Sequence, residues 1–356
     1  MRINSKIKDY SVDLLDDILN KKEELFGTLK YDRLFYFVDG NVKRIYNDQL
    51  REFIGDDFCQ VIEAKEENKE YNNLANYYKV LIENKFTRRD LLVTIGGGIL
   101  QDISGFIAST LYRGIGWVFF PTTLLAQADS CIGSKTSINF GDSKNLIGSF
   151  YPPDHIFIDD TFCKTLTPEY FNSGIGEIIK FHLLSDYERY ALLKEYLSLP
   201  DSMDSRYFKR IILSTLEIKK SYFTEDEFDT GRRNLLNYGH CFGHALESAS
   251  NFIVCHGEAV LVGMGFANLL SLKRGIMNKE KYKEFEAILQ KYYPGYKLSN
   301  ISSDTLVSYL KKDKKRVGND LTMILAEDIG KAYKCDDIKE VEIAQTFQEF
   351  LKIYPK

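Results

Sequence analysis

The chain has 356 residues, of which 44% are hydrophobic and 28% are charged, and its formal net charge is −4. This length and composition are typical of a soluble globular protein with two domains and an ample core. The small negative charge excludes the basic surface of a nucleic-acid-binding protein, and no apolar run reaches the roughly 18 residues of a membrane span.

The amino-terminal stretch MRINSKIKDYSVDLLDD contains no apolar segment, so we do not expect a signal peptide. The six cysteines form no CxxC pair. Cys131, Cys241 and Cys255 fall among the polar motifs described below, where disulfides would obstruct a site. We therefore expect reduced cysteines and a cytoplasmic protein.

The first 160 residues alternate between strand-like and helical segments. Short apolar runs typical of strands lie at residues 34–39, 58–64, 91–95 and 117–121, and a helical pattern covers residues 70–83. Such alternation predicts a mainly parallel sheet covered by helices. The later pattern is mostly helical, so we expect an α/β domain over residues 1–162 and a mainly α-helical domain over residues 163–356.

A glycine turn follows the third strand-like run. Gly96, Gly97 and Gly98 lead directly into a segment of helical periodicity. A strand, a glycine turn and a helix start form a cradle for a pyrophosphate, because backbone N–H groups and the helix dipole favour an anion there. The motif reads GGGxxxD rather than GxGxxG, which weakens the assignment to an ordinary dinucleotide-binding fold. A tight turn without a ligand is the alternative.

A polar segment rich in glycine and serine lies between two further strand-like runs. It carries Asp129, Lys135, Asn139, Lys144 and Asn145. Lysines among small residues bind anions where the backbone lets a ligand approach, and are plain solvated charges otherwise. Apolar residues recur within this segment. A solvated loop does not require them, so we interpret the segment as part of a binding site.

Two pairs of polar residues share predicted helical faces in the later part of the chain. Glu177 and Lys180 lie three residues apart and form either a surface ion pair or a couple that faces a site. Arg233 and Asn237 lie on the same predicted helical stripe as the histidines that follow them. Their presence beside those histidines favours a site over simple packing.

Histidines concentrate between residues 232 and 258, which hold three of the five in the chain. His240 and His244 lie four residues apart, hence on one helical face, and His256 from the following loop can close on the same point. Three nitrogen ligands with an open position suit a catalytic zinc, and a carboxylate from elsewhere could replace one histidine. The alternative is a helix with two buried, hydrogen-bonded histidines.

Taken in order, these motifs resemble those of 3-dehydroquinate synthase and the wider sugar phosphate cyclase superfamily. The matching sequence motifs are GGGILQD, YRG at 112–114, PTTLLAQADSCIGSK, KNLIGSFYPP, GEIIK, GRRNLLNYGHCFGHALE, HGEAVLVGM and DKK at 313–315. Together they span roughly residues 35–330. Iron-type alcohol and glycerol dehydrogenases share the general architecture, but are not expected to combine the lysine-rich segment with the histidine helix.

The resemblance implies an α/β fold in which a Rossmann-like, parallel-sheet NAD-binding domain is followed by an α-helical metal- and substrate-binding domain. It implies a divalent metal, Zn²⁺ or alternatively Co²⁺, held by Glu177, His240 and His256. His244 would then either hydrogen-bond to the metal site or contact the substrate. It also implies a homodimer in which Arg113 reaches into the neighbouring subunit's site.

The other site residues follow from the same resemblance. Lys219 and Arg233 match positions associated with the substrate carboxylate. The residues that match the rest of the substrate site are Asp129, Lys135, Asn145, Lys180, Asn237, His244 and one of Lys314 and Lys315. The implied nucleotide contacts are Asp39, Asn41, Glu66, Lys69, Gly96, Gly97, Gly98, Asp102, Thr122, Thr123, Asp129, Lys135 and Lys144.

The implied reaction converts a seven-carbon 2-keto acid sugar phosphate, 3-deoxy-arabino-heptulosonate 7-phosphate, to 3-dehydroquinate and phosphate. It uses transient oxidation by NAD, phosphate elimination, re-reduction and intramolecular aldol closure, and belongs to the shikimate pathway of aromatic amino acid biosynthesis. Arg233 and Asn237 favour this carboxylate-bearing substrate, because the deoxy-scyllo-inosose synthases tend to lose that pair. Departures from the family pattern at Gln101, Ser134 and Gly176 remove no charged group.

Three alternatives stay open: another sugar phosphate cyclase acting on a related sugar phosphate, a metal- and NAD-dependent polyol dehydrogenase, and a nucleotide-binding regulatory protein without catalysis. A dehydrogenase accumulates NADH, whereas a cyclase releases phosphate and leaves NAD unchanged overall. A regulatory protein would require an incomplete site, yet Glu177, His240, His256, Lys135 and Arg233 are all present. We expect neither nucleic acid nor a membrane as a partner.

Overall fold

The computed structural model describes residues 1–141, 143–199, 203, 205–296, 298–311 and 321–354. The chain forms two compact units, Met1–Leu166 and Thr167–Lys356. The boundary expected after residue 162 falls within the 3-10 segment η5 (Asp160–Thr165), near the end of the first unit. The assignment of cofactor and substrate to separate domains stays a prediction.

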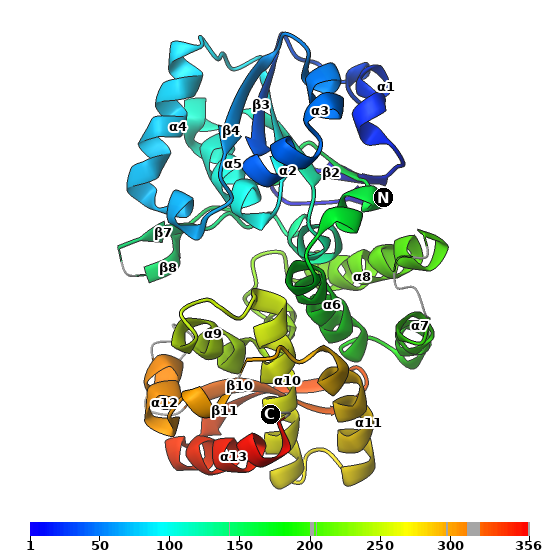
Figure 1. The fold of residues 1–356 in the computed structure, drawn as a ribbon, viewed down its shortest axis with the longest axis vertical. Helices are drawn as coiled ribbons and strands as arrows, with labels where there is room; N and C mark the ends of the chain where they lie inside the picture. Colours follow the sequence, from blue (N-terminus) through cyan, green and yellow to red (C-terminus); the bar gives the residue numbers. More distant parts are fainter. Residues whose placement is uncertain (142, 200–202, 204, 297, 312–320, 355–356) are drawn as a thin grey trace. The chain divides into compact units, whose positions relative to one another are not determined.

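In the described part of the first unit, a seven-stranded sheet has the order β1-β2-β9-β6-β5-β3-β4 (Figure 1). The strands are β1 (Arg2–Ile3), β2 (Tyr10–Leu14), β3 (Leu34–Asp39), β4 (Phe58–Ile62), β5 (Leu91–Gly96), β6 (Gly116–Pro121) and β9 (His155–Ile158). β1 pairs antiparallel with β2, and the other pairs are parallel. β3 and β5 are buried throughout, as their nearly continuous apolar runs require. The expected α/β class is confirmed.

Helices cover both faces of this sheet. They are α1 (Lys22–Phe26), α2 (Gly40–Ile45), α3 (Asn47–Ile54), α4 (Tyr71–Glu83) and α5 (Gly98–Thr110), with 3-10 turns η1 (Ile18–Asn20), η2 (Glu66–Lys69) and η3 (Leu111–Arg113). Side chains alternate between the faces of a strand, so Tyr36 and Phe37 point to opposite sides. Tyr36 packs on Phe53 of α3, and Phe37 packs on Tyr77 of α4.

The remaining segment of the first unit lies against α5. It comprises the π-helical turn η4 (Ala126–Ser130) and the hairpin β7 (Ile138–Phe140) and β8 (Ser143–Ile147). Gly105 of α5 permits the close packing, because a Cβ there would lie 2.8 Å from Thr136 Cγ2 and 3.3 Å from the Trp117 ring. The polar segment is therefore held beside the helix that starts at the glycine turn.

The second unit is mainly helical, as expected. Its elements are α6 (Pro168–Leu183), α7 (Tyr187–Leu197), α8 (Ser205–Glu225), η6 (Arg232–Asn237), α9 (His240–Ala249), α10 (His256–Lys273), α11 (Lys279–Leu289), η7 (Gln290–Tyr292), η8 (Leu298–Asn300), α12 (Ser303–Lys311) and α13 (Glu340–Ile353). An antiparallel hairpin of β10 (Leu321–Asp328) and β11 (Lys331–Ile338) joins them. α10 is buried along most of its length and packs against α6, α9, α11, α13 and β10 (Figure 1). Among the described residues, no helix combines the length and apolarity of a membrane span.

His182 on α6 is a fully buried histidine outside the predicted metal site. Its Nδ1 lies 2.8 Å from the Ile178 carbonyl oxygen, and its Nε2 lies 3.1 Å from Ser214 Oγ. Burial lowers the pKa of this imidazole from 6.5 to about 4. Between these two pH values the unfolded chain binds a proton that the folded chain does not, so acidification favours unfolding.

We therefore predict that His182→Gln makes the protein less sensitive to acid. When the pH falls from 7 to 5, the free energy of unfolding should decrease in both proteins. The decrease should be larger in the wild type by about 2 kcal/mol, the amount that follows from the lowered pKa of His182. Urea unfolding at both pH values measures the difference. Equal losses in the two proteins would contradict the assigned titration.

Candidate functional site

Glycines bring the three predicted metal ligands of the second unit together. A Cβ at Gly257 would collide with the Ser173 carbonyl oxygen, and a Cβ at Gly176 would collide with the carbonyl oxygen of Gly257. α6 and α10 therefore cross in close contact directly beside Glu177 and His256. Gly176, noted as a departure from the family pattern, stands where this structure has no room for a side chain.

Glu177 lies between two of the predicted imidazoles. Its Oε1 is 3.6 Å from Nε2 of His240 and 3.4 Å from Nε2 of His256. His244 completes the group, because ring nitrogens of all three histidines lie within 4.8 Å of one another. His240 and His256 are half-buried and His244 is exposed. The structure thus gathers three imidazoles around one point and places the Glu177 carboxylate against two of them.

The Glu177 carboxylate is fully buried, and neighbouring positive charges stabilise its ionised form. Oε2 contacts the Lys180 ammonium, and Oε1 faces the two imidazoles without a hydrogen bond of good geometry among the described residues. Burial favours the protonated acid, but Lys180 and His256 outweigh it and lower the pKa of Glu177 to about 2. Glu177 is therefore an anion near neutral pH, and Glu177 and Lys180 form a buried couple rather than a surface pair.

The histidines differ in their electrostatic surroundings. Burial, reinforced by the Lys180 charge, lowers the pKa of His240 well below its usual value. Burial acts in the same direction on His256, but Glu247 and Glu177 raise its pKa to about 10. The Glu247 carboxylate lies 3.3 Å from Nδ1 of His256 and fixes that ring from the side opposite Glu177. Glu247 was not among the residues predicted from the sequence, although it lies three residues after His244 on the same helix.

This donor set fits a divalent metal ion. A buried carboxylate oxygen without a hydrogen-bond donor and imidazole nitrogens directed at it are ligands that Zn²⁺ and similar ions prefer. His240 is deprotonated near neutral pH, as a metal ligand must be. His256 is protonated in the absence of metal, so coordination there would release a proton.

The residues before the histidine helix differ from the prediction. Arg233 and Asn237 were expected on one helical stripe with His240, and this is wrong: both lie on the separate 3-10 turn η6. The break occurs at Gly239, whose φ of 79° is left-handed and whose missing Cβ makes room for the Val260 carbonyl oxygen, 2.6 Å from the Cβ position. His256 begins α10 rather than lying in a loop.

Two of the cations expected to contact substrate are buried in this unit. Arg233 is 5% exposed and Lys219 is 7% exposed. The Arg233 guanidinium donates from Nη1 to the Glu227 carbonyl oxygen and lies over the Phe223 ring, 5.4 Å from its centroid. Lys314 and Lys315 lie outside the described residues.

The predicted nucleotide residues of the first unit gather at the carboxyl ends of three neighbouring strands. Asp39 ends β3 and caps α2, where it accepts the N–H of Asn41 at 2.7 Å. Gly96, Gly97 and Gly98 connect β5 to the start of α5. Thr122 and Thr123 follow β6, and a Cβ at Gly97 would lie 2.9 Å from Thr123 Cγ2. This edge of a parallel sheet is where such folds bind ligands.

Lys69 is buried and joins several of the predicted residues into one polar network. Its Nζ lies 2.8 Å from Asp102 Oδ2 and 3.6 Å from Glu66 Oε1, and it donates to Asn145 Oδ1 at 2.9 Å. Burial raises the pKa of Asp102 to about 6 in spite of the Lys69 charge. Lys144 lies 3.9 Å from Glu66. The network ties η2, α5 and β8 together beside the glycine turn.

A further polar link was not expected from the sequence. Gln101 on α5 donates to the Ser130 carbonyl oxygen at 2.6 Å and accepts from the Ser130 hydroxyl at 2.6 Å. It thereby fixes the first turns of α5 to η4, which carries Asp129. Lys135 is exposed and follows Ser134, which adopts a left-handed φ of 63°. The sequence had marked Gln101 and Ser134 only as departures from the family pattern.

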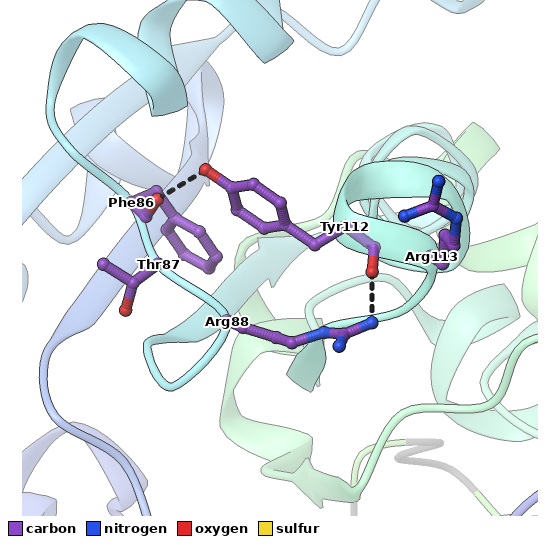
Figure 2. Close-up of a pocket in the computed structure, with 5 residues that line it drawn as sticks. All are labelled: Phe86, Thr87, Arg88, Tyr112 and Arg113. Atoms are coloured by element: carbon purple, nitrogen blue, oxygen red, sulfur yellow. Dashed lines mark hydrogen bonds between the residues drawn. The ribbon is translucent and has the colours of Figure 1, made fainter.

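Arg113 ends a left-handed turn beside a surface pocket of about 400 Å³, lined by Phe86, Thr87, Arg88, Tyr112 and Arg113 (Figure 2). Tyr112 and Arg113 have φ values of 52° and 65°. The Tyr112 hydroxyl donates to the Phe86 carbonyl oxygen at 2.9 Å, and Arg88 donates to the Tyr112 carbonyl oxygen. Figure 2 shows the Arg113 side chain directed away from the Tyr112 ring.

Comparisons with known proteins agree on one family. Residues 59–173 match the family model described as 3-dehydroquinate synthase N-terminal, and residues 174–316 match the one described as 3-dehydroquinate synthase C-terminal. A 3-dehydroquinate synthase of Clostridium botulinum is 36% identical over 337 residues, which cover 93% of this chain and 96% of that protein. The corresponding protein of Clostridium acetobutylicum is 34% identical over 340 residues, 94% and 93% of the two chains.

Solved structures share the fold over nearly the whole chain. The 2-epi-5-epi-valiolone synthase of Streptomyces hygroscopicus, solved with NAD⁺ and Zn²⁺ bound, is 25% identical with a TM-score of 0.87, covering 98% of this chain and 99% of that one. A glycerol dehydrogenase of Schizosaccharomyces pombe is 16% identical with a TM-score of 0.66, covering 97% and 90%. The latter likeness shows the fold alone.

Proposed function

The chain belongs to the 3-dehydroquinate synthase family, and from that premise we infer that it is an NAD- and metal-dependent, phosphate-eliminating cyclase. Its substrate is 3-deoxy-arabino-heptulosonate 7-phosphate, and its products are 3-dehydroquinate and phosphate. The observation that carries this function is the convergence of Glu177, His240 and His256 on one point in a unit that also buries Lys180 and Arg233.

We propose that Glu177, His240 and His256 hold the metal, Zn²⁺ or Co²⁺, whose positive charge would stabilise negative charge developing on a substrate oxygen. Lys180 keeps Glu177 ionised, and Glu247 orients the His256 ring. His244 is the exposed member of the group, so its imidazole is the one that can exchange a proton with a bound substrate.

We propose that the carboxyl edge of the first unit's sheet binds NAD, which supplies the reversible hydride transfer. The glycine turn and the start of α5 would receive the pyrophosphate. The remaining proposed contacts are Asp39, Asn41, Glu66, Lys69, Asp102, Thr122, Thr123, Asp129, Lys135 and Lys144. Lys219 and Arg233 are proposed to bind the substrate carboxylate. Asp129, Lys135, Asn145, Lys180, Asn237 and one of Lys314 and Lys315 complete the proposed substrate site.

The substrate proposal is tested by measuring phosphate release from seven-carbon sugar phosphates with and without a C1 carboxylate. Rapid release from the carboxylate-bearing 2-keto acid alone is the expected result. Faster release from a sugar phosphate that carries a hydroxymethyl group in place of the carboxylate would assign the chain to another cyclase reaction.

We further propose a cytoplasmic location, because all six cysteines are free thiols.

We propose that the enzyme is a homodimer in which Arg113 serves the partner's site. Bonds to Tyr112 hold the turn that carries it, and its exposed side chain is accessible to a partner. Arg113→Ala and Lys135→Ala chains should each be nearly inactive alone. A mixed dimer holds one intact pocket supplied by the other chain's Arg113, so equal mixing should restore about a quarter of wild-type activity.

Subunit exchange in that experiment is verified with two differently tagged chains. The control mixes wild-type chains with Lys135→Ala chains and gives the activity expected from independent sites. Recovery no greater than the sum of the two variants, after proven exchange, would mean that Arg113 serves only its own chain.

A further inference from the structure

The loop between α8 and η6 is organised around one carboxylate. Asp226 accepts the backbone N–H groups of Thr230 at 2.9 Å, Gly231 at 2.7 Å and Arg233 at 3.0 Å. The Thr230 hydroxyl adds a fourth bond at 3.3 Å. Hydrogen bonds to an ionised acceptor are roughly twice as strong as neutral ones, so Asp226 is the main element that closes this loop.

The same loop holds the side chain of Arg233. Its Nη1 donates to the carbonyl oxygen of Glu227, the residue next to Asp226. Phe223, on the last turn of α8, lies under the guanidinium. Asp226 therefore fixes the Arg233 backbone directly, and it fixes the guanidinium indirectly through the position of the Glu227 carbonyl group.

We propose that Asp226 is a positioning residue for substrate binding, which holds the Arg233 guanidinium in the orientation that receives the substrate carboxylate. This proposal rests on the proposed carboxylate-binding role of Arg233. Asp226 is half-buried, and its contacts given above are made to the loop, so it acts through Arg233 rather than on the substrate. A bidentate contact between guanidinium and carboxylate depends strongly on orientation, which makes such a support necessary.

The test is a double-mutant cycle of Asp226→Asn and Arg233→Ala, with kcat and KM measured for the carboxylate-bearing substrate. Asparagine has the same shape but only one acceptor oxygen, so the loop should loosen without a change in volume. Asp226→Asn should raise KM about tenfold and leave kcat within about twofold. In the Arg233→Ala background the same substitution should change KM by less than about twofold, because the group that Asp226 positions is already absent.

Two controls separate positioning from general effects. Glu217→Gln removes the same charge from an exposed position on α8 and should leave both constants unchanged. Urea unfolding and bound metal are measured for every variant. If Asp226→Asn does not fold, Asp226→Glu replaces it, because it keeps the charge but displaces the carboxylate by one methylene, and an intermediate increase in KM is expected.

The outcomes are distinguishable. If Arg233→Ala raises KM but the Asp226 variant does not, or if the two effects multiply in the double variant, Asp226 does not act through Arg233 and the inference is overturned. If Arg233→Ala itself leaves KM unchanged, the carboxylate-binding role of Arg233 fails, and with it both the substrate proposal and the inference.

Discussion

His256→Ala is expected to lose most of its bound metal and to lower kcat/KM at least about 10³-fold, because a Lewis acid supplies several kcal/mol to such a reaction. His256 lies 3.4 Å from the Glu177 carboxylate and is oriented by Glu247. Its loss leaves the proposed metal with one carboxylate and one imidazole, besides the exposed His244. Metal per chain is measured by elemental analysis after dialysis against a weak chelator.

The matched control for that experiment is His155→Ala. His155 lies on β9 in the first unit, where it contacts the Ser11 hydroxyl at 2.7 Å, and it takes no part in the proposed metal site. This variant should keep a full equivalent of metal. A full equivalent of tightly bound metal in His256→Ala would refute the assignment of this residue as a ligand.

Arg233→Ala is expected to lower kcat/KM for the 2-keto acid substrate about 10- to 100-fold. A hydrogen-bonded contact between a buried guanidinium and a carboxylate is worth about 1.5 to 3 kcal/mol, and each 1.4 kcal/mol is a factor of ten. Arg233→Lys should recover only part of the loss, since an ammonium cannot form the two parallel bonds of a guanidinium. Steady-state kinetics with saturating NAD give both values.

The neighbouring arginine provides the control. Arg232 is more exposed, pairs with Glu225 and lies over the Tyr222 ring, so Arg232→Ala removes the same charge from the same turn. Its kcat/KM should remain near that of the wild type. An unchanged kcat/KM in Arg233→Ala would exclude the carboxylate-binding role and remove the preference for a 2-keto acid.

The features predictable from sequence are those with a local signal. The parallel strands are recognisable in the sequence as apolar runs. The glycine turn is recognisable because it lies directly between the apolar run of β5 and the helical pattern of α5. The spacing of His240 and His244 places them on one face of α9, as expected. Glu177 lies more than sixty residues upstream, so its place beside them followed only from the family resemblance.

Other features depend on contacts between distant segments. The 3-10 turn η6 ends before α9 because Gly239 must avoid the backbone of α10, which no local pattern reveals. Lys69 and Asp102 were expected as nucleotide contacts, and their ion pair with each other was not foreseen, because they lie more than thirty residues apart in the chain. The hairpin β10–β11 escaped notice because β11 is largely exposed and polar, with little apolar alternation.

We propose that this enzyme eliminates phosphate without net oxidation, and one measurement tests this directly. Enzyme with one equivalent of NAD is mixed with excess 3-deoxy-arabino-heptulosonate 7-phosphate, and released phosphate and NADH absorbance are followed in the same sample. We predict one phosphate per substrate consumed, 3-dehydroquinate as the product, and no NADH at the end of the reaction. Stoichiometric NADH without phosphate release would contradict the account and identify a dehydrogenase.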